Sequence, residues 1–317
     1  MLRTMLSIVA ALIAVLAVFI CSSYHRDITA AQARLSSGSH LIQTPCGTIE
    51  YADVGTGTPV LSIHGAGGGF DAGLQLGRSL IGRGFRVIAV SRFGYLRTPM
   101  PADASPAAQA DAHACLLDAL RIQRVAVIAA SAGSTSAMQL CIRHPERCSA
   151  LVLISPQAYA PQTSDGPKQG PPKFLMPLLK ASLHSDFLFW AITKMPSAVV
   201  LKTFLGTPQQ DFQKASTRDK AEALSLVEKI LPITPRSAGM WNDSVTNGTA
   251  PRFDLESMRV PTLLIAAQDD LYGTWLYAQY TADHAPNARY ISYPTGGHIL
   301  LGHPEAFEES AKFLRQQ

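Results

Sequence analysis

The stretch VIAASAGSTSA, residues 127–137, places a serine between small residues directly after an apolar run. The apolar residues 125–130 predict a buried strand, and the residues that follow predict a helix. Ser131 therefore lies in the turn between a strand and a helix. In such a turn the residues two before and two after the serine must be small to avoid a collision, and Ala129 and Gly133 meet that need.

Similar apolar runs recur along the chain and alternate with helical patterns. They are rich in Val, Ile and Leu without strict alternation, which is typical of parallel strands buried on both faces. The alternation stops over residues 156–257, where the sequence looks helical, and then resumes. The fold class we expect is α/β, with a mostly parallel central sheet flanked by helices and interrupted by a helical insertion. The predicted strands are TIEYADV (48–54), PVLSIHG (59–65), RVIAVSRFG (86–94), RVAVIAAS (124–131), ALVLISP (150–156), PTLLIAAQDD (261–270) and ARYISYPTGGH (288–298).

Composition favours one large folded domain with an inserted module. The chain has 317 residues, of which 47% are hydrophobic and 16% are charged, so it can bury a sizeable core and disorder is not expected. Residues 168–229 contain nine Lys or Arg and five Asp or Glu, and this segment accounts for the whole net charge of +4. This excess is too mild to indicate nucleic-acid binding, which shows a concentrated basic patch.

The N-terminus predicts a membrane segment. An uncharged apolar run, residues 5–21, follows Arg3 and is just long enough to span a bilayer. We expect a signal anchor over residues 1–24, a linker over 25–40, and the rest of the chain outside the cytoplasm, because the positive charge marks the cytoplasmic side. The alternative is a signal peptide that is cleaved to leave a secreted or periplasmic protein.

The five cysteines match no metal-site spacing, so no metal ligands are predicted. In an oxidising compartment Cys141 could pair with Cys148, and Cys46 could pair with Cys115. The alternative is that these residues are buried free thiols. Cys21 belongs to the apolar N-terminal run and is expected to lie in lipid.

From about Thr48 onward the chain resembles serine-type α/β-hydrolases. Four motifs support the resemblance: HGAGGG (64–69), the ASAGS turn around Ser131, PTLLIAAQDD and a late GGH (296–298). They occur in the family's order of nucleophile, acid and histidine. The family usually has glycine where this chain has Ala129. The resemblance implies a core over residues 41–155 and 258–317, a helical lid over 156–257, and no cofactor.

The resemblance also implies a catalytic triad. Ser131 would be the nucleophile, activated by a general base. His298 is the expected base, since the two glycines before it leave its loop free to turn, and His303 is the competitor. The acid that orients the imidazole would be Asp270 or Asp269, and the family's spacing favours Asp270.

The oxyanion hole is expected to use backbone amides. Ala132, directly after the nucleophile, would supply one amide, and Ala66 in the HGAGGG loop would supply the other. His64 is expected to shape that loop and to take no part in the triad.

The aromatic residues Phe70, Phe93 and Tyr95 follow predicted strands and are candidates for the mouth of a substrate pocket. The insertion adds an apolar set that fits a hydrophobic acyl or aromatic group, or alternatively forms the insertion's own core. This set consists of Phe174, Leu175, Leu178, Leu179, Phe187, Phe189 and Trp190. We expect a small hydrophobic molecule as the substrate.

A competing interpretation uses the glycines differently. Residues 67–72 fit GxGxxA after a strand, and Arg92 stands about twenty residues further on, as a dinucleotide site would require. The fingerprint is short and occurs often by chance. It also leaves the serine turn, the aspartate pair and the GGH loop without a role.

The function expected from the sequence is hydrolysis of a carboxylic ester through an acyl-enzyme intermediate. The same triad serves hydrolases of amides, lactones and carbon–carbon bonds, which remain alternatives. A catalytically silent binding protein with the same fold is a third possibility.

Overall fold

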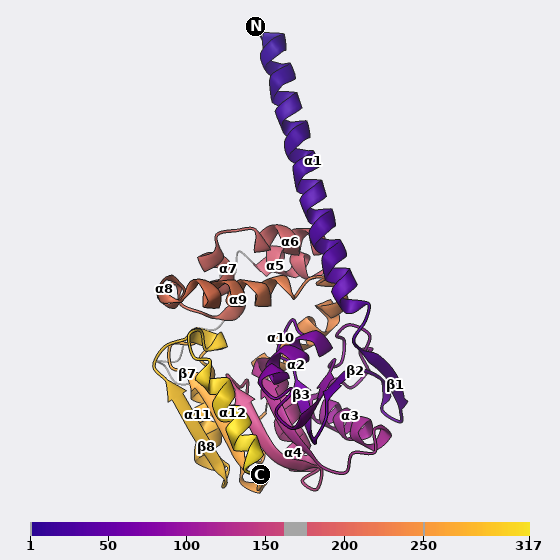
Figure 1. Cartoon of the computed structure of the whole chain (residues 1–317), viewed down its shortest axis with the longest axis vertical. Coiled ribbons are helices and arrows are strands. Elements are labelled where there is room, and N and C mark those ends of the chain that lie inside the picture. The colour runs from indigo at the N-terminus through magenta and orange to yellow at the C-terminus, as the bar shows by residue number, and fades with distance from the viewer. Residues whose placement is uncertain (1, 162–175, 250) are drawn as a thin grey trace.

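The centre of the protein is an eight-stranded sheet with helices on both faces (Figure 1); the computed structural model describes residues 2–161, 176–249 and 251–317. The strand order is β1-β2-β4-β3-β5-β6-β7-β8. The first two strands pair antiparallel, and the six from β4 to β8 in that order are parallel. The predicted α/β fold with a mostly parallel sheet is confirmed. The strands are β1 (His40–Thr44), β2 (Gly47–Gly55), β3 (Thr58–Ile63), β4 (Phe85–Val90), β5 (Val125–Ala130), β6 (Cys148–Ile154), β7 (Thr262–Ala267) and β8 (Ala288–Tyr293).

The central strands are apolar on both sides because a helical layer covers each face of the sheet. In β5, Val127 and Ala129 belong to the cluster that includes side chains of α3, α4 and α11, whereas Ala126 and Ile128 belong to the cluster that includes α12. Burying one such aliphatic side chain contributes about 1.5–3 kcal/mol. The core helices are α2 (Phe70–Leu76), α3 (Pro106–Ala119), α4 (Ser134–Arg143), α11 (Thr274–His284) and α12 (Glu305–Arg315), with short 3₁₀ turns η1 (Gly77–Ser79), η2 (Ser131–Gly133), η5 (Leu255–Ser257) and η6 (Gly297–Ile299).

One edge of the sheet collects the residues that the sequence singles out. The carboxyl ends of parallel strands meet at the same edge. His64 follows β3, Ser131 follows β5, Asp269 and Asp270 come soon after β7, and the loop carrying His298 follows β8.

The insertion between β6 and β7 is helical, as expected, in its described part. Helices α5–α9 form a layer beyond the sheet, beside α1 (Figure 1). Phe189 and Trp190 are buried in this layer's own core, whereas Leu178 and Phe187 are exposed. Phe174, Leu175 and the side chain of Leu179 lie outside the described residues. The helices of the insertion are α5 (Met176–Leu183), α6 (Asp186–Thr193), α7 (Ser197–Leu205), α8 (Gln209–Lys214), α9 (Thr217–Glu228), η4 (Thr234–Arg236) and α10 (Ser237–Thr249).

The N-terminal helix α1 (Leu2–Leu35) is continuous, and it extends away from the rest of the molecule (Figure 1). Its apolar half is exposed, and it is the one helix in the described residues that is long and apolar enough to cross a membrane. The expected linker over residues 25–40 is wrong for its larger part, because the helix continues to Leu35. Ile28 and Ala31 are buried against the insertion, and this packing keeps the segment helical.

Four of the five cysteines form disulfides. Cys46, at the β1–β2 turn, is joined to Cys115 on α3, and Cys141 on α4 is joined to Cys148 at the start of β6. These are the two pairings that the sequence leaves open against free thiols. Cys21 is a free, exposed thiol in α1.

Candidate active site

Ser131 stands on a strained turn at the carboxyl end of β5. Its φ of 49° lies in the left-handed region, which a residue with a side chain rarely adopts. The turn is tight: a Cβ on Gly133 would lie 2.4 Å from the carbonyl oxygen of His64. The small residues around Ser131 are therefore a packing requirement, and Ala129, fully buried, fits where the family usually has glycine. The strain keeps the serine side chain at the rim, where it is partly exposed.

Asp270 and His298 form a buried pair. Nδ1 of His298 lies 2.8 Å from Oδ2 of Asp270, and the two side chains are 11% and 0% exposed. The carboxylate is held in place because it also accepts hydrogen bonds from the amide of Tyr272 and the hydroxyl of Thr274. Asp269 is directed elsewhere and accepts the amide of Gly297 at 2.8 Å. Of the two candidate acids, Asp270 is thus the one that reaches the histidine.

The surroundings keep Asp270 ionised. Burial alone would raise the pKa of this carboxyl group. The charge and hydrogen bond of His298, followed by the hydrogen bonds from Thr274 and Tyr272, outweigh burial and leave the pKa below its ordinary value. An ionised Asp270 can orient the imidazole and stabilise its protonated form.

The loop that carries His298 turns at two glycines with positive φ, 123° at Gly296 and 59° at Gly297. The hydroxyl of Ser155, directly after β6, donates to the His298 carbonyl at 2.7 Å and fixes the loop to the end of that strand. The competing His303 pairs with Glu305 at 2.8 Å, so its ring is engaged away from Asp270.

The loop after β3 lies against the serine. A Cβ placed on Gly65 would lie 3.1 Å from Cβ of Ser131, which shows how closely the loop approaches the serine. Ala66, which is exposed, is the next residue along this loop. Gly67 donates its amide to the hydroxyl of Tyr95, and Nη1 of Arg236 donates to the carbonyl of Gly67 at 3.3 Å. These contacts hold the loop that contains one of the two predicted oxyanion amides.

His64 belongs to the support of this loop. Burial, followed by the charge of Arg92, lowers the pKa of His64 well below its ordinary value. A neutral His64 accepts the amide of Arg92 through Nε2 at 3.1 Å. The ring therefore shapes the loop, and a proton acceptor that is already occupied cannot serve as the base for Ser131.

Two buried ion pairs beside the loop were not predicted. Arg92 makes a two-point contact with Asp243 of α10 at 2.7 and 2.6 Å, and Arg236 reaches Asp71 of α2 at 2.9 Å. Buried arginines must be paired, because an unpaired charge in the core is strongly destabilising. The only sequence signal was the charged residues in an otherwise apolar context. The pairing of Arg92 also removes the cation that the dinucleotide interpretation required.

The three aromatic pocket candidates all lie in the interior. Phe70 is 3% exposed and packs with Ala52 and Ala89, and Phe93 belongs to the main core cluster. Tyr95 is fully buried and donates its hydroxyl to Asp243 at 2.5 Å. Burial, followed by the charge of Asp243, raises the pKa of Tyr95 well above its ordinary value, so the hydroxyl stays protonated. All three thus serve packing and support behind the site.

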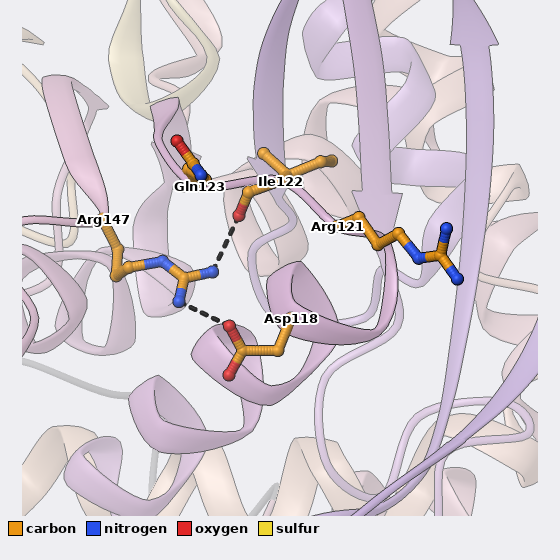
Figure 2. Close-up of a pocket in the computed structure, with 5 residues that line it drawn as sticks. All are labelled: Asp118, Arg121, Ile122, Gln123 and Arg147. Carbon is orange, nitrogen blue, oxygen red and sulfur yellow. Dashed lines mark hydrogen bonds and ion pairs between the residues drawn. The ribbon is translucent and has the colours of Figure 1, made fainter.

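A surface pocket of about 220 Å³ lies at the opposite edge of the sheet (Figure 2). Arg147 crosses it and donates to Asp118 at 2.5 Å and to the Ile122 carbonyl at 2.7 Å. These residues precede β5 and β6, whereas Ser131 follows β5. The pocket is thus separate from the serine. Across the described segments of the chain, no group of three His, Cys, Asp or Glu side chains could hold a metal ion.

A buried Asp–His pair and a serine on a strained turn, together at one edge of a mostly parallel sheet, are the arrangement typical of α/β-hydrolases. A family model for the alpha/beta hydrolase fold matches residues 58–302, so the chain belongs to this family, and the resemblance seen in the sequence is confirmed.

Several of the similar proteins are hydrolases by name. An uncharacterized hydrolase of Bacillus subtilis, YcgS, is 26% identical over 84% of this chain and 94% of its own length. A 2-hydroxymuconate semialdehyde hydrolase of Pseudomonas sp. is 37% identical, but only over 32% of this chain and 38% of its own length. The solved structure of a membrane phospholipase A matches with a TM-score of 0.62 at 18% identity, covering 100% of this chain and 99% of that chain. At that identity the match shows the fold alone.

Proposed function

We propose that the protein is a serine hydrolase that cleaves a carboxylic ester through an acyl-enzyme intermediate on Ser131. The observation that carries the proposal is the 2.8 Å contact between Asp270 and His298 at the edge where Ser131 occupies its strained turn. A catalytically silent binding protein would have no need for a buried carboxylate that orients an imidazole.

In the proposed reaction Ser131 attacks the ester carbonyl while Nε2 of His298 takes the hydroxyl proton. Nδ1–H of His298 donates to Asp270, which fixes the tautomer and stabilises the imidazolium. The amides of Ala66 and Ala132 bind the developing oxyanion. His298 then protonates the leaving alcohol, and a water molecule activated by the same imidazole releases the acid. None of these steps requires a cofactor.

The insertion supports a hydrophobic substrate. Ile230, which follows α9, packs on Gly67 of the oxyanion loop, and Thr207, which follows α7, packs on Gly297 beside the histidine. The insertion thus touches the loops on both sides of the serine, which is the position of a lid. Ile230 belongs to the buried apolar core of the insertion, so it is an apolar part of the insertion that meets the oxyanion loop, and this favours an apolar acyl group.

Carbon–carbon bond hydrolysis is the second candidate, and the 37% identity to the 2-hydroxymuconate semialdehyde hydrolase favours it. Such a substrate carries a carboxylate, which is usually bound by a free arginine or lysine. The two arginines beside the oxyanion loop, Arg92 and Arg236, are already paired with Asp243 and Asp71. This pairing makes the ester the better candidate.

A direct comparison of the two substrate classes tests the proposal. We expect the full-length protein to hydrolyse p-nitrophenyl butyrate and octanoate with a kcat/KM at least about 100-fold above that for 2-hydroxymuconate semialdehyde. The reason is that the carboxylate of the latter substrate would be bound without a cationic partner, and an unpaired buried charge costs several kcal/mol. Both rates are measured by absorbance in the same detergent. The reverse order would favour carbon–carbon chemistry, and no turnover of either class would contradict the ester assignment.

We also propose that α1 anchors the protein in a membrane with the catalytic domain outside the cytoplasm. The exposed apolar half of α1 supports the anchor. The two disulfides support an oxidising compartment. Helix α1 is also fixed to the insertion. Asp27 accepts a hydrogen bond from Nε1 of Trp190 at 2.9 Å and forms an ion pair with Lys194.

Removing residues 1–19 should release the protein from membranes and leave its esterase activity within about twofold, since the packed part of α1 remains. The measurement is the partition between membrane pellet and supernatant, with activity followed in both fractions. If the protein expressed from the full-length gene were instead recovered in the supernatant, and mass spectrometry showed that its first residues were missing, a cleaved signal peptide would be indicated.

A further inference from the structure

The insertion reaches the catalytic histidine loop through a carboxyl group. Asp211 of α8 accepts a hydrogen bond from the amide of Gly296 at 3.2 Å, and Asp269 accepts one from the amide of Gly297 at 2.8 Å. Because these two amides are adjacent in the chain, the carboxyl groups that accept them lie close together, and Asp211 raises the pKa of Asp269 through a side-chain hydrogen bond and through its charge. Adjacent amides directly before His298 are thus held by two acids, one from the insertion and one from the core.

Two carboxyl groups can share a hydrogen bond only if one of them carries a proton. Burial, followed by the hydrogen bond and the charge of Asp211, raises the pKa of Asp269 from its ordinary 3.8 to about 6. The amides of Gly297 and Gly296 act in the opposite direction. Other charged or titratable groups nearby have partners of their own. Asp270 and His298 are paired, and Lys220 donates to the Gln213 carbonyl on α8. His303, which packs on Gly296, is paired with Glu305 at 2.8 Å.

The contact lies on the pair of glycines directly before His298. Gly296 and Gly297 both adopt positive φ, which glycine permits because it has no side chain. Packing of their own side chains therefore cannot fix the conformation of these two residues. The neighbouring turn after α7 approaches the same region, since the Gly206 carbonyl accepts the amide of Leu271 at 3.0 Å. The two acids therefore connect the insertion to the backbone that aims the imidazole.

We propose that Asp211 and Asp269 are positioning residues that act as a hydrogen-bonded acid pair, the carboxyl clamp, which fixes the His298 loop against α8 and loosens when the shared proton is lost. This inference rests on the proposed function only where activity is the readout.

The direction of the pH effect follows from the raised pKa of Asp269. The folded protein keeps this proton up to about pH 6, whereas the unfolded chain releases it near 3.8. The stabilisation by the clamp is therefore complete below pH 3.8 and is lost as the pH rises through 6. Above that pH two carboxylates face each other and repel.

Hydrogen exchange of the peptide that contains Gly296 and Gly297 tests the clamp without any substrate. In the full-length protein we expect protection, corrected for the intrinsic rate, to fall about tenfold between pH 5 and pH 8, since one unit of pKa corresponds to a factor of ten. Asp211→Asn keeps an acceptor for Gly296 and supplies a donor to Asp269, so its protection should stay constant with pH. Asp211→Ala should be poorly protected at both values, and Glu228→Gln, an exposed residue of α9, should behave like the wild type.

Kinetics give a second readout. Asp211→Ala should lower kcat for p-nitrophenyl butyrate about tenfold with little change in KM, since a misdirected base affects the chemical step. The ratio of kcat at pH 8 to kcat at pH 6 should be higher in Asp211→Asn than in the wild type. Equal pH dependence of exchange in wild type and Asp211→Asn would overturn the clamp, whereas a pH-dependent clamp in a protein without esterase activity would overturn only the proposed function.

Discussion

Ser131→Ala should lower kcat for p-nitrophenyl esters by about 10⁴-fold or more, because the remaining groups can stabilise a transition state but have no nucleophile to use. Alanine keeps the Cβ, so the strained backbone at φ 49° is no easier and no harder to form, and the melting temperature should stay unchanged. A fluorophosphonate probe reports on the same hydroxyl, since it modifies a serine only when a base activates it. Labelling should disappear with the activity.

Ser134→Ala is the matched control for this experiment. Ser134 lies three residues further on at the start of α4 and is fully buried, and its hydroxyl has no hydrogen-bond partner among the residues that the structure describes. Its removal should leave labelling and turnover near the wild-type values. Persistent labelling of Ser131→Ala at the wild-type rate would contradict the assignment of the nucleophile.

Asp270→Asn should lower kcat by about 10⁴-fold, because an amide that donates to Nδ1 would hold the imidazole in the wrong tautomer. The change is nearly isosteric. The amide oxygen can keep the hydrogen bond from the Tyr272 amide, and the hydroxyl of Thr274 can turn to accept from the amide nitrogen, so the protein should fold. The melting temperature and kcat are measured on the same preparation. Loss of turnover with an intact melting transition would identify the acid.

Asp269→Asn is the corresponding change one residue away. Its amide oxygen can still accept the Gly297 amide, and its amide nitrogen can donate to Asp211. We expect kcat to fall by less than about tenfold, with a weaker dependence on pH above 6, because the pair no longer loses a proton. A larger loss in Asp269→Asn than in Asp270→Asn would reverse the two roles.

Local patterns explain why the sheet and the edge that carries the candidate site were predictable. The apolar runs that predicted strands needed only their own residues, since a strand covered on both faces is apolar throughout. The turn around Ser131 was also a local signal, because crowding at Gly133 demands small residues within the motif itself. The preference for Asp270 over Asp269 came from the spacing that the family resemblance implies, and the contact of Asp270 with His298 agrees with that choice.

Contacts between distant segments were not predictable. The pairing of Arg92 with Asp243 joins residues 151 positions apart, and nothing near either residue indicates its partner. Tyr95 follows a predicted strand and resembled a pocket residue, but it is buried and its hydroxyl donates a hydrogen bond to Asp243, the partner of Arg92. The helical course of residues 25–35 depends on burial of Ile28 and Ala31 against the insertion, which no local pattern reveals.

If α1 anchors the protein in a bilayer as proposed, its unbroken course has a geometric consequence. A helix rises about 1.5 Å per residue, so Ile28 lies roughly 10 Å along the axis from Cys21, where the apolar run ends. The ring of Tyr24 between them touches Phe187 and Trp190 of α6. Because α1 is continuous through this stretch, the folded domain would not rotate independently of the membrane segment. A tilt of the apolar part of α1 in the lipid would turn the insertion through the same angle.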